Sequence, residues 1–190
     1  YLIDYDRNDL MRHMKSGNRG VLVSKVFDEH EFTSALATKW IVESKVADRT
    51  RGSHLFPLRL DTEGSQMRLE ASSKTKWMTN LSDEMLVWLK ERLNVTVFVS
   101  DATVGPENAS DTDVFSYIYA VLYSPAYRNR YAELLKLDFP HIPLPSNLVL
   151  FNELSRLGGE LVSIHLMEST KLDKHLTEFI GIRNPVVEKV

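Results

Sequence analysis

The chain has no cysteine among its 190 residues. Without thiols it can form no disulfide framework, no cysteine-ligated metal site and no thiol nucleophile. No apolar run approaches the ~20 residues that a membrane-spanning helix needs. The sequence opens on YLIDYDRNDL, with neither an initiator methionine nor a signal-like apolar region. These absences predict a cytoplasmic location and a segment cut from a longer polypeptide.

The common signatures of catalysis are also missing. No glycine-rich loop follows a strand, which leaves the usual nucleotide sites unsupported. Ser24 and Lys25 are consecutive strand residues and face opposite sides of a sheet. Ser163 and His165 lie on nearly opposed helix faces, no aspartate completes a triad, and we expect His165 to pack between helices. The histidines are not at metal-ligand spacing: His13, His30, His54, His141, His165 and His175. We therefore predict no catalytic residue, no metal site and no cofactor in this segment.

A strong excess of positive charge is absent as well, since the formal net charge is −3. A strongly basic nucleic-acid binder would carry a clear surplus of lysine and arginine. The charge is unevenly divided, however. Residues 1–80 hold 13 Lys and Arg against 11 Asp and Glu, whereas residues 81–190 hold 10 against 15. The basic side chains available for phosphate contacts are concentrated in the first half.

Strand patterns dominate the first half of the chain. The segments RGVLVSKV and HLFPLRL are short apolar runs, and Pro57 within the second favours an edge strand. In TKWIVESKV, residues 38–46, apolar residues such as Trp40 alternate with charged ones, which predicts a half-buried strand. The segment 61–80 is polar and unperiodic, so we expect a loop that contains one short strand.

Helical patterns dominate the second half. SDEMLVWLKERL begins with a serine cap and carries acidic residues in the first turn and basic residues in the last, an order that suits the helix dipole. Ser110 and Asp113 bracket the start of a second helix, and Pro125 opens a third. A stripe of apolar residues predicts the buried face of the last helix: Leu150 or Phe151, Leu154, Leu157, Leu161 and Ile164. The pair Gly158 and Gly159 predicts close contact with another backbone, or a kink.

These patterns together predict an α+β fold. We expect a mixed, β-rich N-terminal lobe over residues 1–110, followed by a helical C-terminal part over residues 111–190. Both belong to one compact fragment of a larger chain.

A run of prolines separates the last two helical regions. Pro140, Pro143 and Pro145 exclude a helix and central-strand pairing, so residues 140–145, called the strap below, predict a stiff spacer. Aromatic residues precede the strap at helical spacing: Phe115, Tyr117, Tyr119, Tyr123, Tyr127 and Tyr131. Such a set can form a base-stacking platform, but its spacing favours the interface between packed helices.

The segment VFSYIYAVLYSPAYRNRYAELLKLDFPHIPLP, from Val114 to Pro145, and the following LFNELSRLGGELVSIHLME carry a family resemblance. They resemble the C-terminal specificity region of single-polypeptide type I (type ISP) restriction-modification enzymes and related adenine-specific DNA methyltransferases. The shared pattern is Phe-x-Tyr-x-Tyr, Ser-Pro-x-Tyr-Arg-x-x-Tyr, Asp-Phe-Pro-x-Ile-Pro, and Leu-Gly-x-x-Leu-x-x-x-His-Leu. His141 stands where this pattern would have an arginine.

The resemblance implies a sequence-specific DNA target-recognition module that is not catalytic by itself. The parent chain would be an adenine-N6 DNA methyltransferase with restriction endonuclease activity, using S-adenosylmethionine, ATP and magnesium. The partners of the module would be double-stranded DNA and the methyltransferase, motor and nuclease domains of the same chain. Pro140, Pro143 and Pro145 would couple the recognition lobe to those domains at a fixed angle.

Basic residues on turns and strand ends of the first half are the candidates for DNA contact. Arginine suits guanine edges and lysine suits phosphates. The candidates are Arg12, Lys15, Arg19, Lys25, Arg49, Arg51, Lys74 and Lys76. Two alternatives stay open. A helical protein–protein interaction scaffold without DNA binding would account for the acidic second half, and a small hydrolase or nuclease would need a buried cluster that the sequence does not show.

Overall fold

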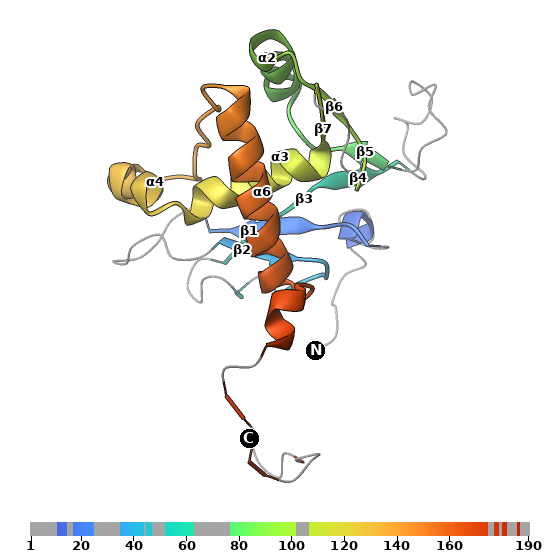
Figure 1. Cartoon of the computed structure of the whole chain (residues 1–190), viewed down its shortest axis with the longest axis vertical. Coiled ribbons are helices and arrows are strands. Elements are labelled where there is room, and N and C mark those ends of the chain that lie inside the picture. Colours follow the sequence, from blue (N-terminus) through green and yellow to red (C-terminus); the bar gives the residue numbers. More distant parts are fainter. Residues whose placement is uncertain are drawn as a thin grey trace.

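The structure is a computed structural model of the whole chain. It describes residues 11–14, 17–24, 35–43, 45–46, 52–62, 77–101, 107–174, 177–178, 180–181 and 186. Figure 1 shows small sheets formed by the first half of the chain and helices that dominate the second half. This arrangement confirms the predicted α+β fold. Within the described residues, no helix is both long enough and apolar enough to cross a membrane.

The largest sheet, sheet A, has the strand order β2-β1-β3 and is antiparallel. Its strands are β1 (Gly20–Val23), β2 (Ala35–Thr38) and β3 (His54–Pro57). The central strand β1 is buried along its whole length, as its apolar sequence predicts. Pro57 lies on the edge strand β3, which confirms the expectation from its missing N–H group.

Two further sheets have two strands each. Strand β4 (Arg59–Asp61) pairs antiparallel with β5 (Trp77–Thr79), and β6 (Thr96–Phe98) pairs parallel with β7 (Asn108–Ser110). A 3₁₀ helix, η1 (Arg12–Met14), lies beside β4. The expected short strand in the polar segment is β5.

The predicted strand over residues 38–46 is wrong. Strand β2 ends at Thr38, and the described residues that follow form bends and turns. Trp40 is 75% exposed and Val46 is 51% exposed, so the alternation of apolar and charged residues does not reflect a buried face. The apolar residues lie outside the sheet because β1 pairs with residues 35–38 instead.

The helices begin where their capping residues predict. Helix α2 (Asp83–Leu93) begins after Ser82, and helix α3 (Asp111–Tyr123) begins after Ser110 with a capping box to Asp113. Pro125 opens α4 (Pro125–Arg130), which breaks before a separate short helix α5 (Ala132–Leu135). The last elements are α6 (Leu148–His165) and the 3₁₀ helix η3 (Thr170–Asp173).

Helix α6 crosses α3 at close range (Figure 1). A Cβ atom on Gly158 would lie 1.9 Å from the backbone oxygen of Ser116, so only glycine fits at this crossing. The neighbouring Gly159 has ordinary space, with Ser116 Oγ 3.5 Å from its would-be Cβ. The predicted close backbone contact is therefore confirmed at Gly158, and α6 continues through both glycines.

The predicted stripe of α6 is confirmed in part, since Phe151 is buried and Leu154 and Leu161 pack against the core. The side that packs on α3 consists of Phe151, Ser155, Gly158 and Val162. Leu157, on the predicted stripe, is 48% exposed. The small residues allow the two helices to approach closely, and this contact decides which face is buried. The apolar residues of the sequence alone do not show which face of α6 is buried.

One hydrophobic core joins the two halves of the chain. It contains Val21 and Val23 of β1, Val114 and Leu122 of α3, and Phe151 of α6, among other residues. The division into a recognition lobe, residues 1–110, and a coupling region, residues 111–190, stays a prediction.

A buried ion pair adds a second link between the halves. The Arg59 guanidinium on β4 donates to both carboxylate oxygens of Asp111, from Nε at 2.6 Å and from Nη2 at 2.7 Å. The Asp111 side chain is fully buried and also accepts a hydrogen bond from the Ser100 amide at 3.1 Å. The hydrogen bond to Asp111 raises the pKa of Arg59, so the guanidinium keeps its charge, and the two-point contact fixes β4 to the start of α3.

Candidate nucleic-acid interface

The segments that carry three of the predicted DNA contacts adjoin one end of sheet A. Val23, Ala35 and His54 are in register at one end of this sheet. Lys25 follows this end of β1 by two residues along the chain, and Arg51 precedes the first residue of β3 by three. Lys25, Arg49 and Arg51 themselves lie outside the described residues. The described strands show that the segments carrying them join the sheet at the same end.

The remaining candidates belong to other edges. Arg19 directly precedes β1 at the opposite end of sheet A, and its guanidinium lies 3.5 Å from the Glu168 carboxylate. Arg12 lies in η1 beside β4. Lys15, Lys74 and Lys76 lie outside the described residues, although Lys76 directly precedes the first residue of β5. Of the eight candidates, only Arg12 and Arg19 lie in the described part of the chain, so the set as a whole stays a prediction.

Two side-chain contacts anchor η1, which carries Arg12. The His13 Nδ1 accepts a hydrogen bond from the Asp61 amide at 2.9 Å, and the Asn18 amide donates to the His13 carbonyl at 2.6 Å. Burial, followed by the charge of Arg12, lowers the pKa of His13 against the smaller opposite effect of Asp61. His13 is therefore neutral at pH 7 and acts as an acceptor, a structural role that fixes η1 to β4.

Helix α4 places Arg128 near the end of sheet A where Ala35 lies. The Tyr123 hydroxyl at the end of α3 donates to the Ala35 carbonyl at 2.6 Å. The Arg128 guanidinium lies over the Tyr123 ring, 4.8 Å from its centroid, and donates from Nε to the Leu122 carbonyl at 2.6 Å. Arg130 is exposed on the same short helix. The sequence indicated only that these two arginines face different sides of the helix.

An aromatic cluster lies at the same end of the sheet. Phe139 makes edge contacts with His54 and Phe56, with ring centroids 5.0 Å and 5.5 Å apart. Phe56 is 42% exposed. This contact joins β3 to the residue that precedes the strap, so the strap begins at a fixed place on sheet A.

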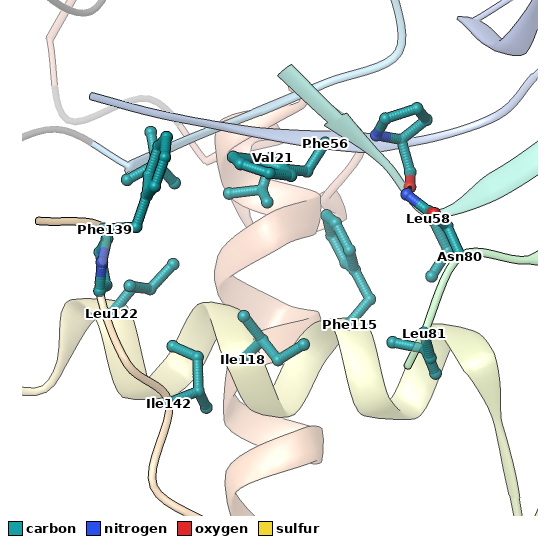
Figure 2. Close-up of a pocket in the computed structure, with 13 residues that line it drawn as sticks. Val21, Phe56, Leu58, Asn80, Leu81, Phe115, Ile118, Leu122, Phe139 and Ile142 are labelled. Atoms are coloured by element: carbon teal, nitrogen blue, oxygen red, sulfur yellow. Dashed lines mark hydrogen bonds between the residues drawn. The ribbon is translucent and has the colours of Figure 1, made fainter. Parts of the chain in front are cut away.

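A cavity of about 370 Å³ lies between sheet A, α3 and the strap (Figure 2). Its lining includes Phe56 and Leu58 from above, Phe115 and Ile118 from α3, and Phe139 from the side. Asn80 is the one polar side chain in this lining, and it donates to the Pro57 carbonyl at 2.8 Å. The lining contains no titratable group, so the cavity offers no acid, base or nucleophile for catalysis.

The tyrosines before the strap are packing residues, as the helical spacing favours. Tyr117, Tyr119 and Tyr127 are buried, at 2%, 0% and 7% exposure, which excludes them as a base-stacking platform. The Tyr117 hydroxyl donates to the Pro143 carbonyl at 2.7 Å, and the Tyr127 hydroxyl donates to the His141 carbonyl at 3.0 Å. Burial raises the pKa of Tyr117 to about 12, so it remains a donor at neutral pH.

These two hydrogen bonds explain why an aromatic-rich helical region precedes a proline strap. The strap carbonyls have no partner strand within the described residues, and hydroxyl groups from α3 and α4 satisfy two of them. Pro145 is fully buried, whereas Pro143 is exposed. The strap is held from both ends, which fits a spacer of fixed geometry.

His165 is also a packing residue, as expected. Its Nδ1 lies 2.7 Å from the Tyr119 hydroxyl, and its ring makes edge contacts with Tyr119 and Tyr123. Among the described residues, no group of three histidine, aspartate or glutamate side chains is arranged to hold a metal ion.

Comparison with known proteins identifies the class of this domain. The family model described as the Type ISP C-terminal specificity domain matches residues 1–190, the entire chain. The chain therefore belongs to the Type ISP C-terminal specificity domain family. The comparison with curated proteins gave no match.

A chain of known structure shares the fold at low sequence identity. A chain in the cryo-EM structure of the DrdV–DNA complex is 22% identical, with a TM-score of 0.60 over 87% of this chain and 14% of that chain. A nuclease-deletion mutant of the Type ISP restriction-modification enzyme LlaGI, in complex with a DNA substrate mimic, is also 22% identical. Its TM-score is 0.47 over 80% of this chain and 10% of that chain. The chain thus spans a small part of the length of both.

Proposed function

We propose that this domain recognises the DNA target sequence of a larger restriction-modification enzyme. The observation that carries the proposal is the match of the whole chain to a specificity-domain family. The fold likeness to a chain of the DrdV–DNA complex supports it, because that relative is a DNA complex of a much longer chain. The domain's partners would be double-stranded DNA and the methyltransferase, motor and nuclease domains of its own parent.

The chemistry of the parent belongs to the same proposal. The parent methylates adenine at N6 and cleaves DNA with S-adenosylmethionine, ATP and magnesium bound outside this domain, and it works in the cytoplasm. The domain itself supplies recognition and is not catalytic. The cavity between sheet A, α3 and the strap supports this division, since its lining of apolar side chains and Asn80 offers no acid, base or nucleophile.

Within the domain, we assign DNA reading to the end of sheet A where Val23, Ala35 and His54 lie. The segments with Lys25, Arg49 and Arg51 join the sheet there, and α4 brings Arg128 to the same region. Arginine forms bidentate contacts with guanine edges, and cations near the strand ends neutralise phosphates. The strap, held by Tyr117 and Tyr127, couples this lobe to the parent.

Replacing both Arg49 and Arg51 with alanine in the full-length parent tests this assignment. Each lost bidentate base contact should weaken specific binding by about 1–3 kcal/mol, and each lost phosphate contact should reduce the salt slope by about one. Binding titrations at several salt concentrations, on target and scrambled duplexes, measure both effects.

A matched control separates a local contact from the loss of charge. Lys90→Ala with Arg92→Ala also removes two positive charges, and both side chains are exposed on α2, which is not part of sheet A. We expect this control to bind target DNA nearly as the parent does. Equal affinity, salt slope and preference in the two double variants would remove Arg49 and Arg51 from the site. Absence of DNA affinity in the parent at any salt would favour the interaction scaffold instead.

A further inference from the structure

Helix α6 has two apolar faces, and only one is fully used within the described residues. The first face, with Phe151, Ser155, Gly158 and Val162, packs on α3 and is buried. The second face lies beside it and carries five large aliphatic residues: Leu150, Leu154, Leu157, Leu161 and Ile164. We call this second face the leucine seam.

The leucine seam has the spacing of a helix–helix interface. Its residues follow one another at intervals of four, three, four and three, which is the heptad pattern of helices that pack side by side. Leu154 and Leu161 lean against the core, whereas Leu150 is 41% exposed and Leu157 is 48% exposed. Leu150 and Leu157, on either side of Leu154 along the seam, therefore remain open to solvent.

The seam continues at its N-terminal end into a second cavity. This cavity of about 270 Å³ lies between α6, α3 and the strap, and its lining includes Tyr117, Leu144, Leu150 and Leu154. Leu144, from the strap, is 43% exposed. The open cavity and the exposed leucines form one continuous apolar path, along which a second helix could place side chains at successive turns.

The charged rim of the seam is internally balanced. Arg156 lies 3.2 Å from the Glu153 carboxylate and 2.7 Å from the Glu160 carboxylate, and Lys171 lies 2.7 Å from Glu160. An apolar centre with a paired, exposed rim is typical of a protein interface. The rim does not select a strongly charged ligand such as DNA.

We propose that the leucine seam is the docking surface for an amphipathic helix from the part of the parent chain outside residues 1–190. The heptad spacing specifies a helix as the occupant. The length of the DrdV chain, of which this domain covers 14%, supports a source within the same polypeptide. The docked helix covers Leu150 and Leu157 and fills the cavity beside Leu144. This surface lies next to the strap, so it gives the coupling role a physical site.

Thiol labelling in the full-length parent tests the proposal. The domain has no cysteine, so Leu157→Cys and Val149→Cys each introduce a thiol on a peptide that mass spectrometry can identify. Val149 is 73% exposed and lies on α6 outside the seam, which makes it a matched control. We expect a maleimide to label Leu157→Cys at least about tenfold more slowly than Val149→Cys, because buried thiols react slowly. In denaturant the two rates should become equal.

Two results would overturn the proposal. Equal labelling rates in the native parent would show that the seam is open to solvent. Protection that disappears when the enzyme is diluted would identify a second copy of the chain as the occupant. Protection that is independent of enzyme concentration supports a helix of the same polypeptide.

The inference rests on the proposed function in one respect, namely that the domain is part of a longer enzyme. Its test is nevertheless separate, because labelling is measured without DNA. If Leu157→Cys is protected but the Arg49→Ala, Arg51→Ala variant binds DNA normally, the docking proposal holds and the DNA-contact proposal is rejected. If Leu157→Cys is labelled as fast as the control but the double arginine variant loses specific binding, the docking proposal is rejected and the DNA-contact proposal holds.

Discussion

The helix pair α3–α6 and the small sheets of the first half are held together in different ways. The helices meet through a close backbone contact at Gly158 and a buried aromatic set. The sheets are short, with three, two and two strands, and polar contacts such as Arg59–Asp111 connect them to the helices. The comparison indicates that the helix pair is the frame of the domain, and that the sheets serve mainly to present the segments between their strands.

The largest expected effect tests the polar link between the two regions. Asp111→Ala leaves the buried Arg59 charge without its main partner, which should lower the free energy of unfolding by about 3–5 kcal/mol. Asp101→Ala is the matched control, since Asp101 also contacts Arg59 but its side chain is 78% exposed. An exposed pair contributes about 0–1 kcal/mol. Urea unfolding measures both variants, and equal losses would contradict the assigned difference.

The next effect tests the frame itself. Gly158→Ala places a Cβ against the Ser116 backbone and should destabilise the domain by about 3 kcal/mol through forced separation of α3 and α6. Gly159→Ala meets only ordinary contacts, so it should stabilise the helix by up to about 1 kcal/mol. The opposite signs in thermal or urea unfolding would confirm the crossing. Similar behaviour of the two variants would show that the helices can shift apart at little cost.

The smallest effect on stability concerns the strap, which joins the two regions to the parent. Pro143 is exposed, so Pro143→Gly creates no cavity and should cost about 1 kcal/mol or less through added freedom of the unfolded chain. In the full-length parent, we expect DNA affinity and sequence preference to persist. The methylation rate on saturating DNA should fall more than binding, because methyl transfer requires the adenine to be placed within about an ångström. Loss of sequence preference with a normal methylation rate would instead place the strap on the reading surface.

Local sequence signals predicted the helix starts well. Ser110 and Asp113 form the capping box that their spacing predicts, and Pro125 occupies the first turn of α4. Such signals act over a few residues, so the sequence contains all that is needed to recognise them. The same holds for the edge position of Pro57.

Contacts between distant residues were harder to predict. Arg59 and Asp111 are far apart in the sequence, and the available signal was only an arginine within an apolar strand and an aspartate that starts a helix. The buried face of α6 depends on which helix approaches it, and Gly158 permits that approach although its own hydrophobicity is low. The type of one residue does not reveal which distant segment packs against it, so these contacts cannot be predicted from local sequence.

The candidate DNA contacts stay a prediction, because six of the eight residues lie outside the described part of the chain. The sequence placed basic residues on turns between strands, and the described strand ends bring the segments with Lys25, Arg49 and Arg51 to one end of sheet A. The sequence does not state the strand pairing, which brings these segments to one end of the sheet, whereas Arg19 directly precedes β1 at the other end. Two tyrosines that hold the strap, Tyr117 and Tyr127, were recognised as packing residues without their hydrogen bonds.

Two tyrosines of α3 place their hydroxyl groups against strand β2, which affects how the domain behaves in a crowded solution. Strand β2 is an edge of sheet A, and an open edge can recruit strands from other molecules. Tyr119 and Tyr123 donate to the Ala35 carbonyl, at 3.3 Å and 2.6 Å, and the Ala37 amide donates to the Tyr119 hydroxyl at 3.2 Å. Two of the backbone groups that a foreign strand would need, the Ala35 carbonyl and the Ala37 amide, are thus already occupied by α3, which disfavours sheet extension on this side.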